Sequence, residues 1–320
     1  MAGIGKDISK AKALLESGEL VAIPTETVYG LAGNALDTDA VLKIYKTKNR
    51  PSFDPLIIHI GEAEQVFKYV QNIPEELMAL CRFFWPGPLT VLLPKKDIIP
   101  DLVTSGLDTV AVRIPDHPLT RELLLSLKFP LAAPSANPFG YISPTRPEHV
   151  MDQLGDKIPY ILDGGNCQVG LESTIVGMEH DQITIYRLGG IEVSAIEKVV
   201  GKVLILPQSS SNPKSPGMLK SHYAPTKPVL LGELDVLIKR YTTKNVNFGI
   251  LSFNKIYKDI DPSRQAVLSP GGSYEEAARN LFSSMRYLDK ADVSVILAEE
   301  LPEEHLGKAI NDRLRRAAAK

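Results

Sequence analysis

Short apolar runs alternate with amphipathic stretches along the first two hundred residues. The apolar runs predict strands at 20–23, 56–60, 90–93, 110–114, 130–133, 160–162, 173–176 and 183–186. Helical spacing of apolar residues falls between many of them, at 5–17, 38–46, 62–71, 74–84, 119–127, 145–154 and 191–200. This mixture predicts an α/β fold, with an open twisted mixed sheet and flanking helices rather than a barrel of eight regular repeats.

The pattern changes at residues 206–227, which hold four prolines, five serines and no long apolar run. Such a segment is typical of a linker between domains. Beyond it, strands are predicted at 229–231, 248–253 and 293–298, with helices at 233–241 and 273–290, the second capped by Ser273. We therefore expect a first domain over 1–205, a linker over 206–227 and a small Rossmann-like α/β domain over 228–320.

Composition narrows the classes of function. The chain has 320 residues, 23% of them charged, with a net charge of −2, so any anion site must be a local cluster of cations. Two distant cysteines, Cys81 and Cys167, argue against a disulfide framework or a cysteine-rich metal site and suit a reducing cytoplasm. No apolar run approaches the roughly 20 residues of a membrane span. The motifs of P-loop and dinucleotide-binding proteins are absent from the sequence.

Polar residues gather around the predicted strand ends between Pro24 and Ile60. The loop Pro24-Thr25-Glu26-Thr27-Val28-Tyr29-Gly30-Leu31 follows one strand, and His59 ends the next. Lys48 and Arg50 stand where Pro51 stops the intervening helix. They are either a solvated helix end or a phosphate clamp. Ligands of open α/β sheets bind at such strand ends.

Three later segments carry similar chemistry. Ser135 and Asn137 follow an apolar run, where they form either a turn or a ligand loop. Arg113 lies in an otherwise apolar strand with no obvious carboxylate neighbour in the local sequence, which favours a ligand carboxylate as its partner. Glu172-Ser173-Thr174 begins another strand, and Arg187 follows the next one.

These segments, in this order, resemble the YrdC-like family of threonylcarbamoyl-AMP synthases. The resemblance rests on the PTETVYGL loop, K-x-R, S-x-N with a later S-P-T, W-P-G-P-L-T, L-E-S-T and P-G-M-x-x-x-H-Y-A-P. The last motif and the C-terminal unit are typical of the long, two-domain subgroup. Leu171 and Leu188 replace the family's usual Val and Pro, the second of which puts the turn after Arg187 in doubt.

The resemblance implies that L-threonine, bicarbonate and ATP give L-threonylcarbamoyladenylate and pyrophosphate, with the product passed to tRNA threonylcarbamoyl transferase proteins. Mg²⁺ would arrive with ATP, without a dedicated protein site. The implied threonine contacts are Thr27, His59, Arg113, Ala133 and Ser173. The implied ATP contacts are Lys48, Arg50, Asp54, Thr109, Ser135, Asn137, Ser143, Arg187 and Tyr223. Asp54 stands where many relatives carry a neutral or basic residue. Tyr223 would belong to a lid that folds back over the nucleotide.

Two rival functions stay open at this point. A module that binds double-stranded RNA or tRNA, even weakly, is one, although the net charge is negative and the basic tail from Arg313 to Arg316 is expected to be a solvated helix end. A related carbamoyl-adenylate enzyme is the other, although the acylphosphatase and zinc-finger segments usual in that branch are absent. His149 and Trp85 are interpreted as structural residues.

Overall fold

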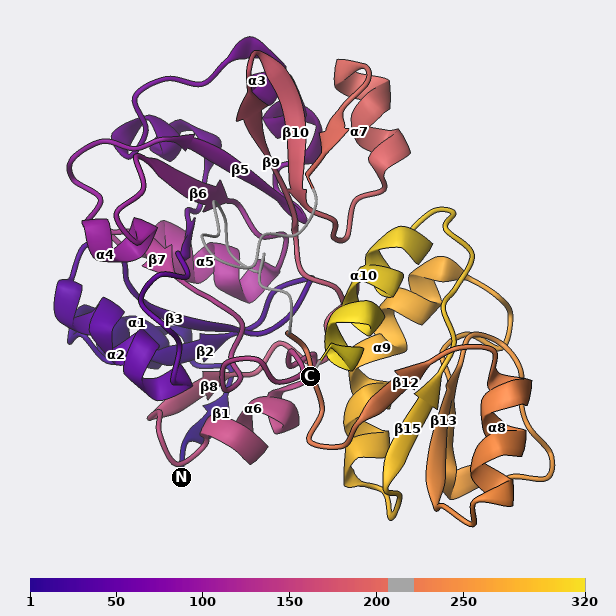
Figure 1. Ribbon diagram of the computed structural model, residues 1–320. Helices are drawn as coiled ribbons and strands as arrows, with labels where there is room; N and C mark the ends of the chain where they lie inside the picture. The colour runs from indigo at the N-terminus through magenta and orange to yellow at the C-terminus, as the bar shows by residue number, and fades with distance from the viewer. Residues whose placement is uncertain (207–221, 320) are drawn as a thin grey trace.

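The computed structural model describes residues 1–206 and 222–319, and two sheets organise these residues (Figure 1). The larger sheet has eleven strands in the order β1-β8-β2-β3-β7-β4-β6-β5-β9-β10-β11 and mixes parallel with antiparallel pairs, as the sequence predicts. Its strands are β1 (Gly3–Gly5), β2 (Val21–Ile23), β3 (Gly30–Asn34), β4 (Ile57–His59), β5 (Leu89–Pro94), β6 (Thr109–Arg113), β7 (Leu131–Ala132), β8 (Tyr160–Leu162), β9 (Thr174–Glu179), β10 (Gln182–Arg187) and β11 (Leu204–Ile205).

The helices of this first unit begin where the sequence offers capping groups. Asp37 accepts hydrogen bonds from the amides of Asp39 and Ala40 at the start of α2, and proline opens α5 and α6. The helices are α1 (Ile8–Glu16), α2 (Thr38–Lys48), α3 (Glu75–Phe84), α4 (Asp101–Thr104), α5 (Pro118–Ser126), α6 (Pro147–Leu154) and α7 (Val193–Val200), with a 3₁₀ helix η1 (Ala63–Lys68).

The second unit has a parallel sheet of four strands in the order β12-β15-β13-β14. Its elements are β12 (Val229–Leu231), α8 (Leu234–Thr243), β13 (Phe248–Ser252), η2 (Pro262–Arg264), β14 (Gln265–Val267), α9 (Tyr274–Lys290), β15 (Val295–Ala298) and α10 (Gly307–Ala318). Ser273 caps α9 as expected, because its hydroxyl accepts from the amide of Glu276. Most of the predicted linker, residues 207–221, lies outside the described residues.

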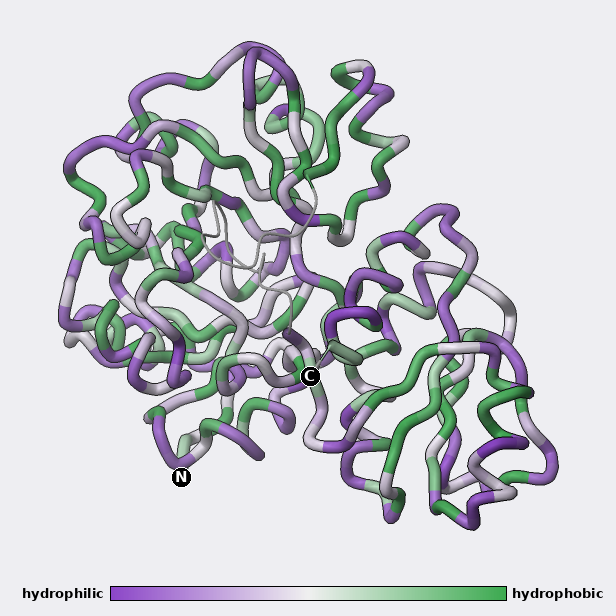
Figure 2. The backbone as a smooth tube through the Cα atoms, viewed as in Figure 1, coloured by the Kyte–Doolittle hydropathy of each residue, from purple (hydrophilic) through white to green (hydrophobic). Residues whose placement is uncertain are grey.

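Hydrophobic residues concentrate on the strands of both sheets, as the hydropathy colouring of the backbone shows (Figure 2). One buried apolar cluster joins the two units, because Val28, Ile142 and Leu171 of the first pack with side chains of α9 and α10. Helix α10 therefore lies against the first unit, and Figure 1 shows it between the two sheets. Within the described residues, no helix has both the length and the apolar content needed to cross a membrane.

Three sequence expectations differ from the structure. Residues 30–34 form β3, not part of a loop; a Cβ on Gly33 would approach Leu20 to 2.9 Å, so close packing explains this glycine. Residues 62–71 hold only the six-residue η1. The basic tail is not a solvated helix end throughout, since Arg313 and Arg316 are 0% and 2% exposed.

Candidate functional site

One cavity in the first unit collects side chains from segments far apart in the sequence. The parallel strands β4 and β6 place His59 beside Arg113 at their carboxyl ends. Of the predicted site residues, eight line this cavity: Arg50, His59, Arg113, Ala133, Ser135, Ser173, Arg187 and Tyr223. The remaining described lining residues are Val28, Pro55, Leu56, Ile57, Pro134, Glu172 and His222. The carboxyl ends of β4 and β6 thus lie at the cavity, as expected for a ligand site in an open sheet.

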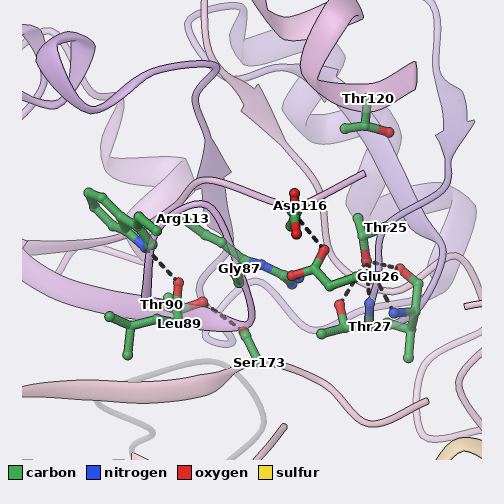
Figure 3. A network of polar contacts seen from close by, with 12 residues as sticks. Thr25, Glu26, Thr27, Gly87, Leu89, Thr90, Arg113, Asp116, Thr120 and Ser173 are labelled. Carbon is green, nitrogen blue, oxygen red and sulfur yellow. Dashed lines mark hydrogen bonds and ion pairs between the residues drawn. The ribbon is translucent and has the colours of Figure 1, made fainter. Parts of the chain in front are cut away.

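Arg113 has a carboxylate partner that lies 87 residues away in the sequence. Its Nη2 is 2.6 Å from Oε1 of Glu26, and its Nε donates to the Gly87 carbonyl at 3.3 Å (Figure 3). The other oxygen of Glu26 accepts from the amide of Asp116 at 3.0 Å. Folding thus supplies Arg113 with a non-local carboxylate that the local sequence does not reveal, and the ligand carboxylate stays a prediction.

Thr27 and His59 differ in their access to the cavity. The hydroxyl of Thr27 lies 2.7 Å from that of Thr25, within the turn of the polar loop, and Thr27 is not among the described lining residues. His59 does line the cavity. Burial, and then the neighbouring Arg113 charge, lower the pKa of His59 to about 3. The imidazole is therefore neutral near pH 7, and its Nδ1 has no hydrogen-bond partner in the described part of the chain.

Ser173, Thr90 and Arg187 form a buried polar cluster on the strand side of the cavity. The hydroxyls of Ser173 and Thr90 are 2.7 Å apart (Figure 3), and Nη2 of Arg187 donates to the Ser173 hydroxyl at 3.0 Å. Nε of Arg187 also donates to the Ser173 carbonyl at 3.0 Å. Burial lowers the pKa of Arg187 to about 10, so this guanidinium stays charged at neutral pH.

Lys48 is buried beneath the site, and it does not line the described cavity. Its Nζ donates to the carbonyls of Ser135, at 2.5 Å, and Asn137, at 2.6 Å, and the residue is 1% exposed. The amide of Asn137 in turn donates to the carbonyls of Pro138 and Tyr141. In this conformation Lys48 is not a solvated helix end, because it is buried and fixes the loop that carries Ser135; the phosphate clamp stays a prediction.

Arg50 and Asp54 form a buried ion pair at the cavity edge. The Arg50 Nη2 is 3.0 Å from Oδ2 of Asp54, while its Nε and Nη2 also donate to the carbonyls of Asp54 and Pro55. The Asp54 oxygens lack hydrogen-bond geometry to a described donor, so this contact is a charge pair. Asp54 is 0% exposed and turned away from the described lining.

Thr109 and Ser143 also lie outside the described lining. Thr109 begins β6 and Arg113 ends it, so about 13 Å separates them along the strand. Ser143 donates to Oε1 of Glu172 at 2.5 Å, which places it one residue behind the cavity wall. The family resemblance brought these two residues into the predicted set; in this conformation Ser143 reaches the cavity wall through Glu172, and Thr109 is not among the described lining residues.

Glu172, His222 and Tyr223 form the wall that faces the second unit. Sequence reasoning assigned no role to Glu172 or His222, although both stand inside quoted motifs. Tyr223 is 1% exposed, its ring stacks on Phe282 at 5.6 Å, and its backbone φ of 62° is unusual for an aromatic residue. For Glu172 the sequence did offer a signal, because a charged residue there stands beside a predicted buried strand.

Acidic groups around the cavity are matched by arginines. Glu26 pairs with Arg113, and Asp54 pairs with Arg50. Glu172 pairs with Arg313. Across residues 1–206 and 222–319, no group of three or more His, Cys, Asp or Glu side chains could hold a metal ion. The cavity therefore offers oriented guanidinium and hydroxyl donors, which suit anionic ligands.

Fold and site together define a class: an α/β protein with a mixed sheet, an arginine-lined cavity and no P-loop motif in its sequence. A family model for the Sua5, YciO and YrdC proteins, described as "Telomere recombination", matches residues 13–189, and one described as "Threonylcarbamoyl-AMP synthase, C-terminal domain" matches residues 191–319. The chain belongs to the threonylcarbamoyl-AMP synthase family.

Relatives of known name match over nearly the whole chain. The threonylcarbamoyl-AMP synthase of Pyrococcus abyssi is 41% identical, over 96% of this chain and 93% of the relative. That of Bacillus subtilis is 42% identical, over 97% and 92%. The crystal structure of P. abyssi Sua5 complexed with L-threonine has a TM-score of 0.92 and 40% identity, and the match covers 99% of this chain and 97% of that one.

Proposed function

We propose that this chain is a threonylcarbamoyl-AMP synthase, which condenses L-threonine, bicarbonate and ATP into L-threonylcarbamoyladenylate and pyrophosphate. The threonine amine and bicarbonate form a carbamate with loss of water. A carbamate oxygen then attacks the α-phosphorus of ATP, and pyrophosphate leaves with the electrons of the broken P–O bond. The observation that carries the proposal is the meeting of Arg50, Arg113 and Arg187 with the Ser135 and Ser173 hydroxyls around one cavity.

This donor set suits a reaction whose reactants are all anionic. Carbamate, carboxylate and triphosphate repel one another, so positioning and charge stabilisation supply most of the catalysis. No covalent nucleophile is needed, and Ser173 is held by Thr90 and Arg187 rather than by a general base. Mg²⁺ would enter with ATP and be held mainly by phosphate oxygens, because Glu26, Asp54 and Glu172 are each paired with an arginine.

For L-threonine we assign Arg113 to the carboxylate, with His59 and Ser173 as neighbouring polar contacts and the Ala133 backbone beside them. The Glu26 contact engages Nη2 of Arg113 and orients the guanidinium, whose five N–H groups allow it to hold a second carboxylate. Thr27 acts by ordering the polar loop with Thr25.

For ATP we assign Arg50, Arg187 and Ser135 as direct phosphate donors, with Tyr223 on the facing wall. Lys48 and Asn137 support the loop of Ser135. Three more of the predicted contacts are assigned supporting positions, and these are Asp54, Thr109 and Ser143. The lid predicted from the P-G-M motif concerns residues outside the described ranges.

The product would pass to proteins that transfer the threonylcarbamoyl group to tRNA, so this chain needs no strong RNA binding of its own. Both cysteines are buried free thiols, which fits the cytoplasm expected from the sequence. Tight, salt-sensitive RNA binding without nucleotide turnover would instead favour the RNA-binding alternative.

The test is pyrophosphate release from ATP with L-threonine and bicarbonate each withheld in turn. We expect release only when all three are present, with L-serine a poor substitute. Consumption of ATP that ignores threonine would refute the proposal.

Arg113→Ala tests the carboxylate assignment. We expect threonine-dependent release to be lost while the affinity for a non-hydrolysable ATP analogue stays within about threefold of wild type, because the phosphate donors remain. Arg82→Ala is the matched control, since Arg82 is exposed and pairs only with Glu75 among the described contacts. Unchanged threonine affinity in Arg113→Ala would exclude this role.

A further inference from the structure

A side chain of the second unit reaches the wall of the cavity. Arg313 on α10 is 0% exposed, and its Nε donates to Oε2 of Glu172 at 2.9 Å. Its Nη2 donates to the Leu188 carbonyl at 2.8 Å, and its Nη1 is 2.6 Å from Oδ2 of Asp312. Its guanidinium carbon lies 5.0 Å from the centre of the Tyr223 ring. Arg313 thus touches two residues that line the cavity without lining it itself.

The ion pair between Arg313 and Glu172 keeps the carboxylate in the cavity wall ionised. Burial would raise the pKa of Glu172, but the Arg313 guanidinium, and then Arg187, outweigh it, so the pKa lies below its ordinary value. Glu172 is therefore an ionised carboxylate beside a cavity that we assign to phosphate. A buried carboxylate without its cation would be unfavourable in itself and would repel an incoming polyanion.

We infer that Arg313 is a positioning residue of the catalytic site, which neutralises Glu172 and holds Tyr223 so that ATP can bind beside them. The inference rests on the proposed function, with the triphosphate as the anion. It gives the C-terminal unit a defined part in the reaction, because α10 supplies the charge that makes this wall compatible with ATP.

The alternative is that Arg313 only joins the two units. Both roles predict that Arg313→Met lowers the melting temperature, so stability cannot separate them. The two roles differ in the effect that adding Glu172→Gln has on the ATP affinity of Arg313→Met. If Arg313→Met weakens ATP binding because Glu172 is left unpaired, removing the charge of Glu172 restores the affinity. If the variant weakens ATP binding because the interface between the units is loosened, Glu172→Gln does not restore the affinity.

The experiment measures the affinity of the full-length chain for a non-hydrolysable ATP analogue, together with KM for ATP and KM for L-threonine. We expect Arg313→Met to bind the analogue at least about tenfold more weakly, with a larger rise in KM for ATP than for threonine. The Glu172→Gln/Arg313→Met double variant should return to within about threefold of Glu172→Gln alone.

Arg315→Met is the matched control on the same helix. Arg315 is half exposed and bonds to Glu300 and Glu303, so we expect wild-type affinity. If Arg313→Met does not fold, Arg313→Lys is measured in its place. Lysine keeps the charge but not the planar guanidinium, so this variant should bind the ATP analogue about threefold more weakly than wild type. The Glu172→Gln/Arg313→Lys variant should recover that affinity.

Analogue affinity equal to that of Arg315→Met, or a double variant as weak as its Arg313 parent, would overturn the inference. Failure of the proposed function would give a different result from failure of the inference about Arg313. In that case the wild-type chain itself shows no threonine-dependent pyrophosphate release, whereas analogue binding still reports on Arg313 in every variant.

Discussion

Replacing Lys48 by methionine should destabilise the ligand-free protein. The change keeps the apolar stem but removes the ammonium that donates to the carbonyls of Ser135 and Asn137. Each buried carbonyl left without a donor costs about 1–3 kcal/mol, so the two together cost about 2–6 kcal/mol. Part of this is offset, because burial lowers the pKa of Lys48 well below its ordinary value and the ammonium is itself unfavourable there.

We therefore expect a net loss of about 2–4 kcal/mol, which corresponds to a melting temperature lower by about 3–6 °C for a chain of this size. The assay is thermal unfolding without nucleotide, with Lys46→Met as the control, because Lys46 lies on the same helix with an exposed side chain. A phosphate clamp would lose nucleotide affinity but leave this melting temperature unchanged. A melting temperature within about 2 °C of the control would thus refute the structural role.

Other predictions concern separate parts of the molecule. Stability should fall as the pH drops from about 6.5 toward about 3, since burial, and then nearby arginines, lower the pKa of His149 to about 3 and only the unfolded chain takes up its proton; melting curves of His149→Gln should show a shallower dependence. Gly189→Ala should reduce turnover at least about tenfold, because its Cβ would lie 2.4 Å from the Glu172 carbonyl oxygen, whereas Gly271→Ala meets nothing within 4 Å and should match wild type in the same pyrophosphate assay. Asp289→Ala should cost about 2–4 kcal/mol in denaturant unfolding, as three buried or half-buried donors from the first unit and the inter-unit segment lose their acceptor; an unchanged midpoint would contradict this.

The sequence predicted the fold where burial dictates residue type. The eight apolar runs of the first unit all became strands of the large sheet, because a strand covered on both faces must be apolar throughout. Strand β3 was missed since Gly30 and Gly33 break that pattern, and their reason is close packing against other elements. The basic tail from Arg313 to Arg316 was expected to be a solvated helix end because arginine is rarely buried without a partner, and the Glu172 partner of Arg313 is distant in sequence.

The same limit explains what was missed in the site. Motif positions brought Arg50, Arg113 and Arg187 to one cavity correctly, but pairing across 87 and 141 residues, as in Arg113–Glu26 and Arg313–Glu172, cannot be seen in local sequence. The contact of Lys48 with the Ser135 carbonyl was not predicted for a related reason: at a frayed helix end, a lysine that reaches phosphate and one that reaches a backbone carbonyl have the same sequence pattern.

Pairing of Glu26, Asp54 and Glu172 with arginines has a consequence for how the site can work. Arg50, Arg113 and Arg313 are largely neutralised by Asp54, Glu26 and Glu172, so the site does not attract anions through a large net charge. Attraction must come instead from N–H groups that the ion pairs hold in fixed directions, since such oriented donors bind anions at short range with little reorganisation. A chain with a net charge of −2 can bind a triphosphate in this way, whereas binding of an RNA backbone requires an extended cationic surface. The arginine–carboxylate pairs thus favour a small anionic substrate over a nucleic acid.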